Sequence, residues 1–184
     1  MDESGFYTAR ESASMLGINL RALTSLREAR LLPEPFIVGK QNLYRKHDVD
    51  NLATRTTMVA PYPPAYVVRV SAAQATPHEP DRDWMGYIAG AYPDADDEGG
   101  TDSPLVSALA GWWPVRSPEK YEGYPLVATL STFVVWTALI VPGGESRAGR
   151  YRFAVEPLEP DSDAFAGRRL KLERGPISLA IGFG

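Results

Sequence analysis

Few residues of this 184-residue chain have the types and spacing that enzyme chemistry requires. The chain has no cysteine, and its only histidines are His47 and His78. A nucleophile would therefore be a serine or threonine, but no Gly-x-Ser-x-Gly sequence is present. No glycine-rich phosphate-binding loop follows a predicted strand. We therefore expect no catalytic centre, no enzyme activity and no cofactor.

One acidic segment has the spacing of a calcium-binding loop. Residues 93–103, PDADDEGGTDS, carry five acidic residues and two glycines. The position that needs a bidentate glutamate to close such a loop is occupied by Leu105. We interpret the segment as a solvated acidic loop and expect no metal site.

Recognition of nucleic acid is the chemistry that the side chains near the N-terminus fit best. In residues 20–28, LRALTSLRE, the leucines recur at helical spacing and are predicted to face a core. The remaining side chains face outward, and the candidates for DNA contact among them are Arg21, Ala22, Thr24, Ser25 and Arg27. An arginine here can bind a guanine edge through two hydrogen bonds, which is worth roughly 1–3 kcal/mol of discrimination. Arg27 fits a phosphate contact, and a surface ion pair with Glu28 or Glu34 is the alternative.

A second group of cations follows at a predicted hairpin. Lys40 lies at its tip, and Arg45 and Lys46 lie at its exit. These side chains fit contacts with phosphates or with the minor groove, with a solvated hairpin as the alternative.

The elements that position these side chains can be predicted almost residue by residue. Thr8 and Glu11 have the spacing of a capping box and start a first helix that Gly17 ends. Asn19 caps a second helix, with Leu20, Leu23 and Leu26 as its buried stripe. The later elements are a hairpin of residues 36–38 and 42–45 around Gly39-Lys40-Gln41, and a short third helix over residues 48–53.

This order of elements resembles the winged helix-turn-helix domains of the MerR and excisionase families. The matching residues are Tyr7-Thr8-Ala9, Glu11, Ala13, Leu16-Gly17, Leu23, Leu31-Leu32-Pro33, Val38-Gly39, Leu43-Tyr44-Arg45 and Asp48-Val49. The resemblance covers roughly the first third of the chain. It implies that the second helix enters the major groove and that the hairpin, as the wing, contacts the backbone. No heptad pattern follows Leu52, so the long dimerisation helix of MerR regulators is not predicted.

Composition limits the class of protein. Apolar residues make up 44% of the chain and its net charge is -4, which argues against a generally basic nucleic-acid binder. Residues 1–58 carry eight Lys/Arg and seven Asp/Glu, so the acidity lies in the remainder. The absence of cysteine and of an apolar N-terminal run favours a cytoplasmic, nucleoid-associated protein. The most apolar stretch, residues 126–141, is too short for a membrane helix, and no membrane contact is expected.

The rest of the chain predicts a second domain rich in β-strands. Residues 59–65 contain three prolines and are predicted to be a semi-rigid linker between domains at 1–58 and 66–184. About six strands are predicted to curl into a small barrel or sheet, over residues 66–70, 126–130, 133–141, 149–155, 168–173 and 177–181. The fold class is therefore α+β.

The order of features in this second domain is similar to that of PUA-like small β-barrels, which are nucleic-acid readers. The features are Trp113 at a strand start, the paired strands LVATLSTFVVWTALI, the strand from Gly149 to Phe153, and Gly167-Arg168. A possible second nucleic-acid surface consists of Arg150 and Arg152 on one strand and Arg169 and Lys171 on another. Alternatively, this domain mediates a homodimer or binds a protein partner.

These observations favour a sequence-specific, double-stranded DNA-binding transcriptional regulator of prokaryotic or phage type. Two alternatives remain open. One is an excisionase-like recombination accessory factor that bends DNA, and the other is a protein-binding adaptor.

Overall fold

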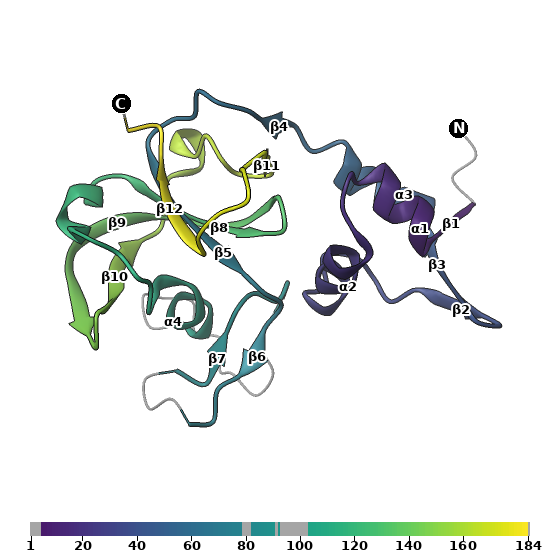
Figure 1. The fold of residues 1–184 in the computed structure, drawn as a ribbon, viewed down its shortest axis with the longest axis horizontal. Helices are drawn as coiled ribbons and strands as arrows, with labels where there is room; N and C mark the ends of the chain where they lie inside the picture. Colours follow the sequence, from purple (N-terminus) through teal and green to yellow (C-terminus); the bar gives the residue numbers. More distant parts are fainter. Residues whose placement is uncertain (1–4, 79–81, 91, 93–102, 184) are drawn as a thin grey trace.

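The chain folds into a mixed α+β structure (Figure 1). The computed structural model describes residues 5–78, 82–90, 92 and 103–183. The acidic segment predicted over residues 93–103 lies outside these residues, apart from Ser103. We call residues 5–55 the N-terminal unit and the described residues from 56 to 183 the β unit. No helix among the described residues has the length and apolar character needed to cross a membrane.

The N-terminal unit contains three short helices and a three-stranded antiparallel sheet of order β1-β3-β2. Its elements are β1 (Phe6–Thr8), α1 (Ala9–Met15), α2 (Leu20–Glu28), β2 (Phe36–Val38), β3 (Gln41–Arg45) and α3 (Lys46–Ala53). The third helix thus starts two residues before the predicted position. Lys46 is consequently a helical residue rather than part of the hairpin exit.

The predicted caps start the first two helices. Thr8 Oγ1 accepts a hydrogen bond from the Glu11 amide, and the Glu11 carboxylate accepts one from the Thr8 amide. Asn19 Oδ1 accepts a hydrogen bond from the Ala22 amide at 2.8 Å, which caps α2. Gly17, with φ at +62°, forms the turn between the helices because a glycine adopts this conformation without strain.

The β unit is built on a seven-stranded mixed sheet of order β12-β5-β8-β9-β11-β4, with β10 also paired to β9. Its strands are β4 (Thr57–Met58), β5 (Ala65–Val70), β8 (Pro125–Leu130), β9 (Phe133–Arg147), β10 (Arg150–Glu156), β11 (Arg169–Leu170) and β12 (Ser178–Ile181). Among the described residues no pairing joins β12 to β4, so the sheet is open, and the predicted alternative of a closed barrel does not form.

Several boundaries in the β unit differ from the sequence prediction. Residues 142–144, Pro-Gly-Gly, follow the strand predicted over residues 133–141 but lie within β9, which continues for 15 residues. The extended part of β9 pairs antiparallel with β10, with Glu145 opposite Arg152. The strand predicted over residues 168–173 is only the two-residue β11.

A short helix connects the parallel strands β5 and β8. Helix α4 (Pro104–Ala110) is capped by Ser103 Oγ, with Pro104 in its first turn. The connection also contains a small hairpin, β6 (Gln74–Ala75) and β7 (Trp84–Met85), and the 3-10 helix η1 (Pro118–Tyr121). A second 3-10 helix, η2 (Pro160–Ser162), follows β10. The parallel pairing of β5 with β8 explains why a helical crossover is needed here.

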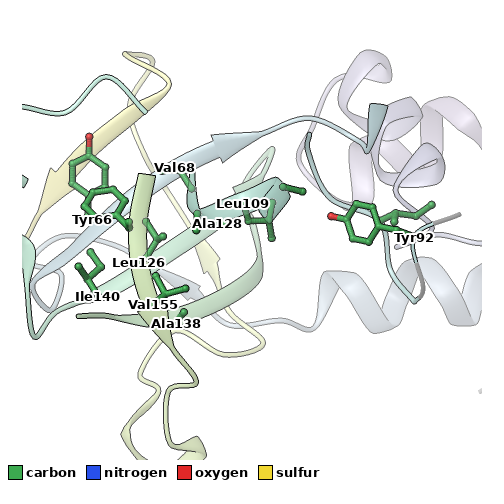
Figure 2. Close-up of a cluster of buried hydrophobic side chains, with 13 residues drawn as sticks. Tyr66, Val68, Tyr92, Leu109, Leu126, Ala128, Ala138, Ile140 and Val155 are labelled. Carbon is green, nitrogen blue, oxygen red and sulfur yellow. The ribbon is translucent and has the colours of Figure 1, made fainter. Parts of the chain in front are cut away.

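The main core of the β unit lies between α4 and the sheet. Leu109 from α4 packs with Val68 of β5, Leu126 of β8, Ile140 of β9 and Val155 of β10 (Figure 2). All five side chains are buried. A smaller cluster includes Val67 of β5 and Val127 of β8, which are adjacent to Val68 and Leu126 in sequence, together with Phe165 and Leu170.

The segment predicted as a linker is packed against the sheet. Strand β4 pairs in parallel with β11, and the Tyr62 hydroxyl donates a hydrogen bond to the Lys171 carbonyl at 2.6 Å. Met58 and Tyr62 also pack against the smaller cluster of the β unit. The first predicted domain, residues 1–58, therefore ends with a strand that belongs to the β unit, and the predicted semi-rigid linker contacts that unit through Tyr62.

The two units share one hydrophobic core. Ala72, Leu130 and Phe133 of the β unit belong to the same buried cluster as Leu16 and Leu26 of the N-terminal unit. Figure 1 shows α2 on the side of the N-terminal unit that faces the β unit.

Polar contacts also cross this boundary. The Ala89 amide donates to the Ala29 carbonyl at 2.8 Å. An Arg169 Nη2 group donates to the Leu16 carbonyl at 2.6 Å. These contacts fix the position of α2 relative to the sheet.

Candidate nucleic-acid interface

The outer face of α2 presents two of the predicted contact residues to solvent. Arg21 and Thr24 are exposed even though the β unit is docked against the same helix. The Thr24 hydroxyl donates to the Leu20 carbonyl at 3.1 Å, which leaves its oxygen able to accept a further hydrogen bond. No ion pair restrains Arg21 among the described residues, so its guanidinium is available to a ligand.

The other predicted contact residues of α2 are less accessible. Ala22, Ser25 and Arg27 are half-buried. The Ser25 hydroxyl donates to the Arg21 carbonyl at 3.3 Å. Arg27 lies 3.8 Å from the Glu28 carboxylate and 3.9 Å from that of Glu34, so the surface ion pair considered as its alternative role is the one observed.

The exposed face of α2 also includes Leu20, which was predicted to be buried, and Glu28, which was predicted to face outward. Leu20, assigned to the buried stripe, is 48% exposed. The leucine spacing could not reveal this, because the first turn of a helix can project beyond the core that its later turns contact. Glu28 is exposed and lies seven residues after Arg21, on the same side of the helix. Its carboxylate adds negative charge to the face that carries Arg21.

The hairpin places two cations in solvent, and the first residue of α3 places a third beside a tyrosine. Lys40 is exposed in the turn between β2 and β3. Arg45 is exposed, with its guanidinium carbon 5.2 Å from the centre of the Phe36 ring. Lys46 is half-buried, with Nζ 5.3 Å from the centre of the Tyr7 ring. Lys40 and Arg45 are therefore the better placed of the three for a phosphate contact.

The strand β2 exposes an unusual amount of apolar surface. Phe36, Ile37 and Val38 are 45%, 75% and 60% exposed, respectively. The strand lies at the edge of its sheet, where exposed apolar residues are normally avoided. This apolar edge adjoins the cationic hairpin tip.

The possible second nucleic-acid surface does not form a single basic stripe. Arg150 faces Arg147 near one end of β9, whereas Arg169 faces Phe133 at the other end. The side chain of Arg152 is half-buried and approaches Ser107 Oγ at 3.5 Å. Lys171 is exposed but lies outside any strand.

Arg169 has a structural position. Besides the Leu16 carbonyl, its guanidinium binds Thr132 Oγ1 at 3.1 and 3.2 Å and lies 4.5 Å from the centre of the Phe133 ring. Burial lowers the pKa of this guanidinium, which nevertheless stays charged because arginine is not deprotonated in proteins. It is therefore removed from the set of nucleic-acid contacts.

The titratable groups give no sign of acid–base chemistry in the described part of the chain. Burial raises the pKa of the Tyr66, Tyr87 and Tyr92 phenols, so these groups stay neutral. His47 is exposed and its Nε2 lies 2.9 Å from the Asn51 amide nitrogen. No cluster of three His, Asp or Glu side chains suited to a metal ion occurs among the described residues.

Comparison of the chain with protein-family models, with curated proteins and with solved structures gave no match.

Proposed function

We propose that residues 5–55 are a winged helix-turn-helix module and that the protein is a sequence-specific DNA-binding regulator of prokaryotic or phage type. The observation that carries the proposal is the exposed pair Arg21 and Thr24 on an Asn19-capped helix, in the same unit as a hairpin with exposed Lys40 and Arg45. In helix-turn-helix proteins, the second helix presents its N-terminal residues to base edges. Arg21 and Thr24 occupy the first and second turns of α2.

The proposed contacts fall into two classes. Arg21 binds a guanine edge and sets base preference, which is worth roughly 1–3 kcal/mol against a wrong base. Lys40 and Arg45 bind phosphates, which carry no sequence information. With two or three phosphate contacts, the slope of log affinity against log salt is about -2 to -3. Affinity for non-specific duplex is then in the weak range of about 10⁻⁴ to 10⁻⁶ M.

Glu28 provides a test of orientation, because its carboxylate lies on the proposed DNA-facing side of α2. A carboxylate held near phosphates opposes binding, so Glu28→Gln is expected to tighten it. Its ion pair with Arg27, at 3.8 Å, is long and partly exposed to solvent, so it contributes little to stability. The opposite effects of Arg21→Ala and Glu28→Gln identify the side of the helix that meets DNA.

The experiment is a salt titration of the full chain with a labelled random duplex, followed by selection of bound sequences. Lys40→Ala is expected to weaken all duplexes alike and to reduce the salt slope by about 1. Arg21→Ala is expected to relax preference at one position of the selected motif. Arg116→Ala, an exposed arginine of the β unit, is the matched control and leaves both measurements unchanged.

Two results would redirect the assignment. If the full chain shows no salt-sensitive duplex binding at about 50 mM salt, the DNA proposal fails. A protein-binding adaptor then becomes the better function, because Ile37 and Val38 already expose an apolar strand edge. If the duplex is bound and strongly bent at arrayed sites, the excisionase-like accessory role replaces that of the regulator.

A further inference from the structure

A cationic pocket of about 250 Å³ opens on the β unit, and no residue of α2 lines it. Its walls come from β5, β7, α4, the residues that follow α4, and the start of β10. The side chains that matter for the inference are Arg69, Arg82, Trp112, Trp113 and Arg150. Three arginines thus line one small pocket.

No described residue that lines the pocket carries a carboxylate. This is notable in a chain that has more acidic than basic residues. Arg69 donates to the backbone carbonyls of Gly175, at 3.2 Å, and of Glu173. Arg150 donates to the Trp112 carbonyl at 3.3 Å. Backbone carbonyls orient these two guanidinium groups without neutralising their charge.

The guanidinium groups of Arg69 and Arg150 both have N–H donors that bind no described residue. A guanidinium has five N–H groups. Among the described residues, Arg69 uses two of its nitrogens and Arg150 uses one. Arg82 also lines the wall and donates to the Gly111 carbonyl at 2.8 Å. An oxyanion in the pocket would therefore meet oriented, charged donors.

The aromatic wall is fixed by the backbone. Trp113 Nε1 donates to the Leu109 carbonyl at 2.9 Å, which orients the indole ring. The Trp113 amide and carbonyl both pair with Tyr151 of β10. Trp112 and Trp113 are half-buried, and the Arg147 guanidinium carbon lies 6.0 Å from the centre of the Trp112 ring. The pocket thus combines flat apolar surface with positive charge.

The backbone at Ser71 and Gly86, which both line the pocket, is also tightly packed. Gly86 has φ at +87°, and a Cβ atom on it would lie 2.6 Å from the Ala72 carbonyl oxygen. The adjacent Tyr87 amide donates to the Ser71 carbonyl at 2.9 Å. Because these backbone segments are hydrogen-bonded in place, the pocket is formed before any ligand arrives.

We propose that this pocket binds a small planar ring that carries one phosphate or carboxylate group. Pockets for drug-sized ligands occupy roughly 300–1,000 Å³, so a slightly smaller pocket suits a single ring with one substituent. The guanidinium groups of Arg69 and Arg150 bind the anionic group, since arginine recognises both phosphate and carboxylate oxygens. The ring lies against the indole surface of Trp112 and Trp113. This site is independent of the proposed DNA contacts.

The test uses the full chain labelled with ¹⁵N and follows the indole N–H signals of its four tryptophans. The probes are phenyl phosphate and benzoate, with phenol as the ring without charge and inorganic phosphate as the charge without a ring. Saturable shifts of the Trp112 and Trp113 signals are expected with phenyl phosphate, benzoate or both. Phenol and inorganic phosphate are expected to bind at least about tenfold more weakly, because each lacks half of the contacts.

The variants separate this pocket from general attraction of anions to the surface. Arg150→Gln is expected to weaken the tighter probe by about tenfold, the loss of one charged hydrogen-bonding partner. Arg168→Gln changes an exposed arginine outside the pocket and leaves binding unchanged. Unaltered dispersion of the amide spectrum in both variants shows that the fold is retained.

Three results would overturn the proposal. The first is the absence of saturable shifts with either charged ring. The second is an equal loss of binding in Arg150→Gln and Arg168→Gln. The third is a response confined to Trp136, which lies on β9 and does not line the pocket.

Discussion

Replacing Arg169 with methionine tests whether the two units are held together as the structure indicates. The guanidinium joins β11 to the end of α1 by donating to the Leu16 carbonyl at 2.6 Å. It also binds Thr132 Oγ1 and stacks against the Phe133 ring. Methionine keeps an unbranched apolar chain but removes the charge and every N–H donor. The change therefore removes the polar contacts while retaining much of the apolar contact.

The expected loss of unfolding free energy is about 2–3 kcal/mol. A hydrogen bond to a charged group contributes roughly 1.5–3 kcal/mol. The contact of Arg169 with the Phe133 ring adds about 0.5–1 kcal/mol. The sulfur atom of the new methionine can also contact the Phe133 ring, which replaces part of the stabilisation lost from the arginine–ring contact. Arg168→Met is the control, because its side chain is exposed and surface changes usually stay within about 0.5 kcal/mol.

Two measurements check this prediction. Urea unfolding gives the loss of stability of each variant relative to the unchanged chain. Amide hydrogen exchange then locates the loss, because the Ala89 amide donates to the Ala29 carbonyl across the boundary between the units. Protection of that amide is expected to fall in Arg169→Met and not in Arg168→Met. If the two variants were equally stable to within about 0.5 kcal/mol, Arg169 would not hold the units together.

Three further predictions concern single residues. Asn19→Ala removes the cap of α2 and is expected to cost about 1 kcal/mol in urea unfolding. Hydrogen bonds from Thr8 lower the pKa of Glu11, so its contribution to stability is present above the unfolded pKa and is lost as pH falls through the folded value. Acid unfolding of Glu11→Gln should lack that component, and identical pH profiles would contradict it. Gly86→Ala is expected to destabilise the chain more than Gly149→Ala, because both have positive φ but only the first meets backbone atoms within 4 Å.

The elements of the N-terminal unit could be predicted from sequence because their signals are local. A capping pair at Thr8 and Glu11, a cap at Asn19 and a turn at Gly39 each act within a few residues. The errors in the prediction for this unit concern which side chains are exposed more than where the helices and strands lie. Leu20 fits the helical period but lies outside the core, and Arg27 is occupied by neighbouring carboxylates. The exposure of Leu20 and the ion pairing of Arg27 both depend on neighbouring residues of the folded chain, and the helical period of the sequence gives no information about those neighbours.

In the β unit, long-range pairing overrode local signals. Pro142-Gly143-Gly144 is a turn sequence, yet it lies within β9 because β10 supplies a paired strand alongside. Helix α4 had a local signal, Ser103 followed by Pro104, that was not recognised as a helix start. The sequence contains only a weak local signal for the cationic pocket, which is that Arg69 interrupts an otherwise apolar strand. Its partners Arg82 and Arg150 are distant in sequence, so only the fold brings them together.

The shared core changes how the N-terminal unit should be studied. A proline-rich linker implies that the first 58 residues fold and bind DNA alone, but Phe133 and Leu130 of the β unit complete the cluster that buries Leu16 and Leu26. Removing the β unit would expose that apolar surface, and the cost of such exposure is about 25 cal/mol per Å². A fragment that failed to bind DNA would therefore report on its stability rather than on its contacts. The exposed Arg21 is best tested in the full chain, where the β unit already holds α2 in position.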